Sequence, residues 1–188
     1  MSAERTTIKN RHGLKLVIQV DAPKNHANLA FIAHGQGGHM EQKHIQAFTD
    51  AFLENNYRVV RFDATHSIGA SEGDIMDVTY TSYIKDLEDV INWARQQSWF
   101  QSPYALCGHS MGGTSTGWFA KHHAREIQCL APLSAVINFD VYNDYTRKRA
   151  PGFMEEWQAK GYFEREGRSK PGAIKRIGWG VAEDLKKV

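Results

Sequence analysis

Apolar residues along the chain fall into short runs that alternate with longer amphipathic stretches. Short runs rich in branched apolar residues are typical of strands, and apolar residues recurring every three or four positions are typical of helices that cover a core. The runs that predict strands cover residues 14–20, 28–35, 57–63, 104–110 and 127–136. The stretches that predict helices cover residues 41–55, 80–97 and 111–125.

This alternation predicts an α/β fold with a mainly parallel sheet flanked by helices. Right-handed crossovers between parallel strands place the helices on both faces of the sheet. In such sheets the chemistry gathers at the carboxyl ends of the strands. Here those ends lead into loops that start near His34, Asp63, Ser110 and Ala135.

The alternation stops at about Phe139, which divides the chain into two predicted regions. Residues 1–138 form the sheet-based core, and residues 139–188 form a helical, cap-like region rich in aromatic and charged residues. A solvated charged face explains that composition. The functional alternative is a cap over the active site, in which Trp157 lines a substrate pocket.

The pentapeptide "GHSMG" combines Gly108, His109, Ser110, Met111 and Gly112, and it lies between a predicted strand and a predicted helix. A serine on such a sharp turn is raised above the sheet, and glycines on either side allow the tight bend. The amides at the start of the following helix favour developing negative charge. We therefore expect Ser110 to be a nucleophile, with the amide of Met111 as one oxyanion donor.

A second glycine-rich loop, "HGQGG", follows the predicted strand 28–35 and supplies the second donor. Its glycines, Gly35 and Gly37 among them, allow backbone amides to approach a substrate closely. We assign the second oxyanion donor to the amide of Gln36, and we expect His34 to order the loop.

Three segments taken in order, "FIAHGQGG", "RFDATHSIGASEGD" and "LCGHSMGG", resemble the α/β-hydrolase superfamily, in particular its esterase and lipase-like serine hydrolases. The resemblance covers about residues 12–138. It implies hydrolysis of carboxylic ester or thioester bonds in small molecules through an acyl-enzyme on Ser110, with no metal and no organic cofactor. The substrate itself does not transfer with the fold.

The resemblance also implies an acid and then a histidine after the nucleophile. The only histidines after Ser110 are His122 and His123, about 18 Å along the predicted helix at ~1.5 Å per residue, too far to act as its base. We therefore expect the triad acid and histidine downstream of Val188, in a fold that is incomplete at its C-terminal side. Two alternatives stay open: a degenerate, non-catalytic member that binds a ligand or partner, and an acyltransferase that uses the same serine.

Other polar residues are weaker candidates for the site. Asp63 and His66 follow a strand and are candidates to line the pocket, as are His39 and His44. Asp140 and Asp144 follow the strand 127–136, where some members of the superfamily carry an alternative acid, although ordinary helix capping and solvation explain them better.

Composition limits the classes of partner that we expect for this chain. The 188 residues are 41% hydrophobic and 23% charged with a net charge of +2, which excludes nucleic acid and anionic membranes as expected partners. The N-terminus has no signal-peptide core and no run has the length of a membrane span. Cys107 and Cys129 lack metal-ligand spacing, and we expect both to be free, buried thiols in a cytoplasmic protein. An apolar last strand, 127–136, is expected to stand at an exposed sheet edge and to favour self-association.

Overall fold

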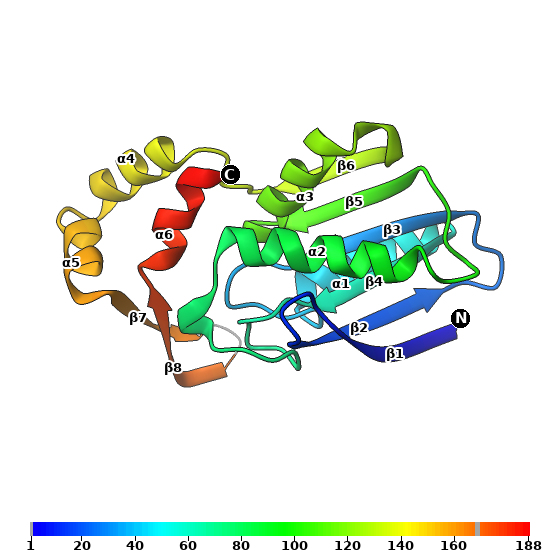
Figure 1. Cartoon of the computed structure of the whole chain (residues 1–188), viewed down its shortest axis with the longest axis horizontal. Helices are drawn as coiled ribbons and strands as arrows, with labels where there is room; N and C mark the ends of the chain where they lie inside the picture. The colour runs from blue at the N-terminus through cyan, green and yellow to red at the C-terminus, as the bar shows by residue number, and fades with distance from the viewer. Residues whose placement is uncertain (1, 168–169) are drawn as a thin grey trace.

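Six strands form one sheet in the computed structural model, which describes residues 2–167 and 170–188 (Figure 1). Their order is β1-β2-β4-β3-β5-β6; β1 and β2 are antiparallel to their neighbours, and the other strands pair in parallel. The strands are β1 (Ser2–Lys9), β2 (Lys15–Ala22), β3 (Asn28–Ala33), β4 (Tyr57–Asp63), β5 (Tyr104–His109) and β6 (Ile127–Leu133). The predicted α/β class with a mainly parallel sheet is confirmed.

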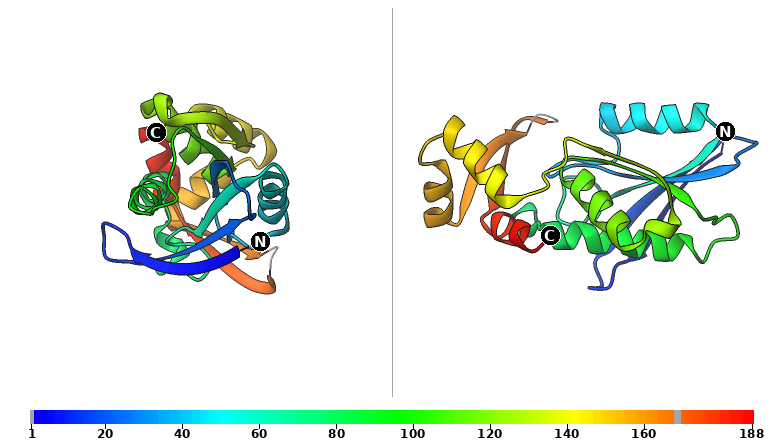
Figure 2. Two further views of the ribbon diagram at one scale, coloured as in Figure 1. Left: turned by 90° about the vertical axis from the view of Figure 1, so that its right-hand side faces the viewer. Right: turned by 90° about the horizontal axis from the view of Figure 1, so that it is seen from above.

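Helices cover both faces of this sheet, as Figure 2 shows in the view from above. One face carries α1 (Lys43–Glu54), and the other carries α2 (Tyr80–Ala94) and α3 (Met111–His122). Short 3-10 turns lie at Ile75–Asp77, Ala124–Glu126 and Leu185–Lys187. Thr79 caps the start of α2 with a capping box. Its hydroxyl oxygen accepts a hydrogen bond from the Ser82 amide, and the Ser82 hydroxyl oxygen accepts one from the Thr79 amide.

Two apolar clusters hold these layers together. Under α1, Ile45 and Leu53 pack with Ile32 and Val59 of the sheet. The larger cluster fills the space between the sheet and α2 and α3 and continues into the C-terminal part of the chain. β3 is buried along Leu29–Ala33, as its continuous apolar sequence predicts for a strand between two helical layers.

The first strand, β1, was not predicted, because its sequence is polar and mostly exposed. It pairs with β2 through a turn in which the Asn10 side-chain oxygen accepts hydrogen bonds from the amides of His12 and Leu14. Gly13 in this turn has a φ of +79°, a conformation that favours glycine.

β6 is the edge strand of the sheet, and this position corrects the expectation for one cysteine. Cys107 on the interior strand β5 is buried, and burial raises the pKa of its thiol to about 11. Cys129 on β6 is exposed. Leu130 and Leu133 on the same strand each retain 40% exposure. Association through this edge stays a prediction.

A smaller lobe follows β6 and lies beyond the carboxyl ends of the parallel strands (Figure 1). Its elements are α4 (Phe139–Arg149), α5 (Phe153–Lys160), β7 (Tyr162–Gly167), β8 (Lys170–Gly178) and α6 (Gly180–Asp184). The sequence predicted helices and loops here, and the antiparallel pair of β7 and β8 is an addition. Charged residues interrupt both strands, and β8 also contains proline and glycine, so their apolar alternation is weak.

The lobe is attached to the sheet by packing and by one buried carboxylate. Trp157 and Ile177 belong to the same apolar cluster as Leu87 of α2. The Asp184 carboxylate accepts hydrogen bonds from the amide of Thr81, at 2.6 Å, and from its hydroxyl, at 2.9 Å. Thr81 lies in the first turn of α2, where the helix favours negative charge. The predicted boundary near residue 138 therefore separates regions that share one core.

Candidate active site

Ser110 occupies the sharp turn between β5 and α3 in a strained backbone conformation. Its φ is 53° and its ψ is −118°, and such a conformation costs a residue with a side chain about 1–3 kcal/mol. The Ser110 amide donates to the Leu133 carbonyl at 2.8 Å, and its carbonyl accepts from the Thr114 amide at 2.9 Å. Bonds to β6 and to α3 therefore hold the turn.

The two glycines of the pentapeptide allow this turn by close backbone contacts. A Cβ on Gly108 would lie 2.3 Å from the Gly112 carbonyl oxygen, and a Cβ on Gly112 would lie 2.3 Å from the Ala33 carbonyl oxygen. Neither backbone atom can move aside as a flexible side chain would. The glycines are thus required for α3 to start directly above the ends of β3 and β5.

The loop after β3 lies against Ser110. A Cβ on Gly35 would be 3.2 Å from the Ser110 Cβ. The Gly35 carbonyl accepts hydrogen bonds from the Gly38 amide at 3.0 Å, from the His34 Nδ1 at 2.8 Å and from the Tyr83 hydroxyl at 3.2 Å. In a trans peptide the next N–H points opposite to that carbonyl, so these donors also fix the direction of the Gln36 amide.

His34 is a fully buried bridge in this arrangement. Its Nε2 accepts from the Ala64 amide at 3.0 Å, so the proton lies on Nδ1, which donates to Gly35. Burial lowers the pKa of His34, against the opposing effects of the Gly35 carbonyl and of Asp63. The ring is therefore neutral and links the loop after β3 to the loop after β4 through these two hydrogen bonds.

Asp63 joins the two loops that follow β3 and β4. Its carboxylate accepts from the amides of Met40 and Ala70, each at 2.7 Å, and the residue is 2% exposed. Asp63 does not line the pocket beside Ser110, contrary to one expectation from the sequence. Its two hydrogen bonds fix the backbone of the loops that follow β3 and β4.

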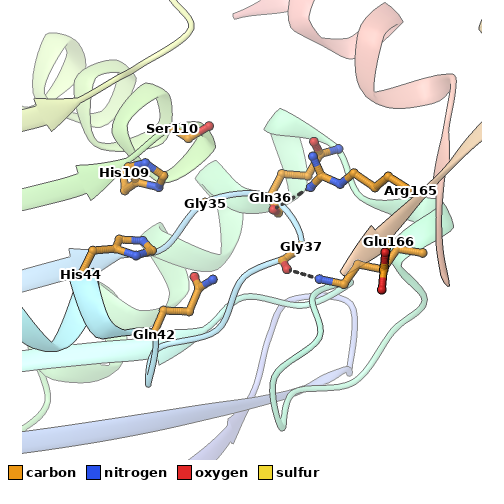
Figure 3. A pocket seen from close by; sticks show the side chains of 10 residues that line it. Gly35, Gln36, Gly37, Gln42, His44, His109, Ser110, Arg165 and Glu166 are labelled. Atoms are coloured by element: carbon orange, nitrogen blue, oxygen red, sulfur yellow. Dashed lines mark hydrogen bonds between the residues drawn. The ribbon is translucent and has the colours of Figure 1, made fainter. Parts of the chain in front are cut away.

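A cavity of about 760 Å³ opens in front of Ser110 (Figure 3). The residues that line it are Gly35, Gln36, Gly37, Gln42, His44, His109, Ser110, Arg165, Glu166 and Lys175. The ring centroids of His44 and His109 lie 4.6 Å apart, and in Figure 3 the Ser110 hydroxyl points away from both rings. Burial lowers the pKa of both histidines, and the neighbouring His109 lowers that of His44 further.

Several residues singled out in the sequence lie elsewhere. Trp157 is 3% exposed and its Nε1 donates to the Ile177 carbonyl at 3.0 Å, so it is core of the lobe rather than pocket wall. His66 lies outside the pocket lining, with its Nδ1 3.1 Å from the Asp74 carbonyl. Asp140 and Asp144 are exposed on α4, and Asp144 pairs with Lys148. His122 and His123 pack on Trp118 and Phe119 toward the far end of α3.

Sequence reasoning missed the charged residues that the lobe brings to the pocket. Arg165 and Glu166 come from β7, and Lys175 comes from β8. Lys175 Nζ donates to the Gly37 carbonyl at 2.9 Å, and Arg165 donates to the Gln36 carbonyl at 3.4 Å. These partners lie more than 120 positions apart in the chain, and no short pattern signals such a contact.

The part of the chain that the structure describes holds no cluster of three or more histidine, cysteine, aspartate or glutamate side chains arranged to bind a metal. In residues 2–167 and 170–188, no helix has both the length and the apolar character needed to cross a bilayer.

A family model and a curated relative match this chain. A family model described as serine aminopeptidase S33 matches residues 24–167. The pyrethroid hydrolase of Sphingobium wenxiniae is 33% identical over 81 residues, which are 43% of this chain and 27% of that relative. The chain therefore spans little more than a quarter of this curated relative.

Solved structures share the fold at lower identity. Est1E from Butyrivibrio proteoclasticus, solved with ferulic acid bound, has a TM-score of 0.72 at 22% identity, over 97% of this chain and 71% of that one. An esterase from Pyrococcus furiosus has a TM-score of 0.66 at 21% identity, over 82% of this chain and 59% of that one. At these identities the likeness shows the fold alone.

Proposed function

The chain belongs to the serine aminopeptidase S33 family of α/β-hydrolases, and from this premise we propose that it hydrolyses carboxylic ester or thioester bonds through an acyl-enzyme on Ser110. One observation carries the proposal: Ser110 is held at positive φ at the start of α3, beside a 760 Å³ cavity and the loop of Gly35. Strain of this kind persists where the surrounding structure enforces it for function. Ester substrates are favoured because esterases are among the proteins that share the fold.

In the proposed reaction the Ser110 Oγ attacks the carbonyl carbon of a bound ester and transfers its proton to a base. The amides of Gln36 and Met111 then donate hydrogen bonds to the oxyanion that forms. The alcohol leaves with a proton, and the acyl group stays on Ser110 until water attacks it and releases the acid.

In this proposal, none of the described histidines acts as the base. The rings of His44 and His109 pair with each other away from the Ser110 hydroxyl, and His122 and His123 lie on the far half of α3 or beyond it. The proposal therefore takes the triad acid and histidine from sequence beyond Val188. A binding protein without catalysis and an acyltransferase are the alternatives that the test must separate.

Covalent labelling tests the nucleophile directly. In the protein that includes the sequence supplying the triad acid and histidine, a fluorophosphonate probe should modify Ser110, as shown by mass spectrometry of the labelled peptide. Ser110→Ala in that protein should lose both labelling and hydrolysis of a panel of short esters. Ser115→Ala is the matched control, because Ser115 lies on the same helix with its hydroxyl bonded to the Met111 carbonyl inside the core. Retention of wild-type ester turnover by Ser110→Ala would show that the nucleophile is elsewhere. Faster transfer to an added alcohol than to water would identify an acyltransferase.

A further inference from the structure

Two side chains that line the cavity in front of Ser110 each carry a buried nitrogen that has no hydrogen-bond partner in the described part of the chain. These nitrogens are Nε2 of Gln36, on the loop after β3, and Nε2 of His44, in the first turn of α1. Buried polar groups in folded proteins nearly always have partners, because a buried donor or acceptor without one lowers stability. A ligand in the cavity that both side chains line is able to supply the missing partners.

Both side chains are uncharged at neutral pH. The carboxamide of Gln36 does not ionise. Burial lowers the pKa of the His44 imidazole, and the neighbouring His109 and His39 lower it further. A neutral imidazole has one N–H donor and one acceptor nitrogen, and a carboxamide also offers both functions. A hydroxyl group, which donates and accepts, therefore suits either side chain.

The charges on the lobe side of the cavity do not by themselves favour an ionic ligand. Arg165 and Lys175 line that side together with Glu166, so side chains of both signs are present. An ion that enters the cavity loses much of its hydration, whereas a hydroxyl group loses only hydrogen bonds that a neutral side chain can replace. Neutral polar ligands therefore match Gln36 and His44 better than ionic ones.

Each of the two nitrogens reaches a ligand by rotation about one terminal bond. The last torsion of a glutamine side chain and the χ2 torsion of a histidine are broad, so the amide and the ring can both turn over. Such a turn breaks no hydrogen bond of these nitrogens, because neither has one within the described residues. In Figure 3 the two side chains lie on opposite sides of Gly35, so they face different parts of a bound ester.

We propose that the cavity selects esters that carry a neutral hydroxyl group a few bonds from the scissile carbonyl, and that the side chains of His44 and Gln36 bind this hydroxyl. The inference rests on the proposed ester hydrolysis and names its substrate class. The hydroxyl binds without a covalent change, while the ester bond breaks at Ser110 as already described. The cavity volume of about 760 Å³ lies within the usual range of small-molecule sites.

Two pairs of isosteric esters test the selection, one for each side of the ester bond. Propyl butyrate differs from 2-hydroxyethyl butyrate by a methyl group in place of the hydroxyl of the alcohol. Methyl 3-methylbutyrate differs from methyl 3-hydroxybutyrate in the same way in the acyl group. In the protein that includes the downstream triad residues, kcat/KM should be higher for the hydroxyl ester in at least one pair.

His44→Leu or Gln36→Met should lower that ratio of kcat/KM values about three- to tenfold, as expected for losing one hydrogen bond between neutral groups. His44→Gln should retain more of the ratio than His44→Leu, because its amide keeps a neutral donor and acceptor. His122→Leu is the matched control, at an exposed histidine on α3 outside the cavity lining, and its ratios should equal those of the wild type. Wild-type ratios of one or less in both pairs overturn the inference, as does a preference that both His44→Leu and Gln36→Met retain.

Binding of the same esters to Ser110→Ala, measured by NMR titration, separates this inference from the proposed function, because binding needs no nucleophile. If no ester is hydrolysed in a Ser110-dependent way, the proposed function fails. The preference for the hydroxyl ester in binding, and its loss when His44→Leu or Gln36→Met is added, then decides the inference.

Discussion

His34 and Tyr83 show how single residues prepare the site without touching a substrate. Both donate a hydrogen bond to the Gly35 carbonyl, so the Gln36 amide on the other side of that peptide points away from these two side chains. His34 does this only in its neutral form, because its Nε2 must accept from the Ala64 amide. Protonation would turn that acceptor into a second donor and break the bridge.

This arrangement predicts a loss of stability in mild acid. The groups around the His34 ring are Asp63, Tyr83, His39 and His44, and burial outweighs the favourable charge of Asp63, so the folded-state pKa lies below 6.5. As the pH falls below about 6.5, the unfolded chain takes up a proton that the folded chain does not. The His34 contribution to stability is thus complete above that pH and is lost progressively down to the folded-state pKa, by about 1.4 kcal/mol per unit of pKa difference.

Urea unfolding across this pH range measures the effect. The free energy of unfolding should fall more steeply with decreasing pH in the wild type than in His34→Gln, whose side chain does not titrate. His12→Gln, at an exposed histidine in the turn after β1, should follow the wild type. Parallel pH profiles for the wild type and His34→Gln would mean that His34 is not held neutral by burial.

Individual residues differ in how far the sequence reveals them. The positions of Ser110 and of the loop of Gln36 can be predicted because they depend on local patterns, a strand followed by glycines. The places of Arg165 and Lys175 in the cavity wall cannot, because they depend on where β7 and β8 fold back. Trp157 was misassigned for the same reason: an aromatic residue in a cap is equally suited to line a cavity or to fill a core.

At the scale of elements, α3 shows two kinds of glycine in one helix. Gly112 is pressed against the backbone of β3, whereas an added Cβ on Gly117 meets nothing within 4 Å. Alanine is the better helix former by about 1 kcal/mol when there is space for its methyl group. The same substitution should therefore have opposite effects at the two positions.

Gly112→Ala should destabilise the protein by about 2 kcal/mol or more, because its Cβ would lie 2.3 Å from the Ala33 carbonyl oxygen and α3 must shift. Gly117→Ala should stabilise it by up to about 1 kcal/mol. Chemical denaturation of the two variants beside the wild type measures both effects. Equal effects, in either direction, would be incompatible with the close packing of α3 on β3.

Most elements of the sheet and its covering helices were predictable because their sequences are apolar. β2 to β6 and α1 to α3 are marked by apolar runs and helical spacing, and all of them except the edge strand β6 bury side chains in the two clusters. β1 is polar and mostly exposed, and β7 and β8 mix charged residues with a few buried ones such as Ile177, so hydrogen bonds to a neighbouring strand contribute much to their structure. Cys129 was expected to be buried because its strand is apolar, but an apolar strand at an edge leaves its side chains exposed.

At the scale of the whole molecule, the cavity exists only where the lobe meets the sheet. One wall is the loop of Gly35 and Gln36 with Ser110, and the other is the pair β7 and β8 with Arg165 and Lys175. The position of the lobe therefore sets the distance between the proposed nucleophile and the cations. Asp184 attaches the lobe to α2, because its buried carboxylate accepts hydrogen bonds from both the amide and the hydroxyl of Thr81 at the start of that helix.

Asp184→Ala should loosen the lobe while the sheet stays folded. Two charge-assisted hydrogen bonds are lost, and the Thr81 amide is left with only water to bond, which together should cost about 2–3 kcal/mol. Hydrogen exchange should accelerate in β7, β8 and α6 and remain slow in β3 and β5. Asp144→Ala, at an exposed carboxylate on α4 with a surface ion pair, should change neither the exchange rates nor the free energy of unfolding. If exchange in β7 and β8 is the same in Asp184→Ala as in the wild type, the lobe is held by its apolar contacts with α2, and the charged wall of the cavity does not depend on Asp184.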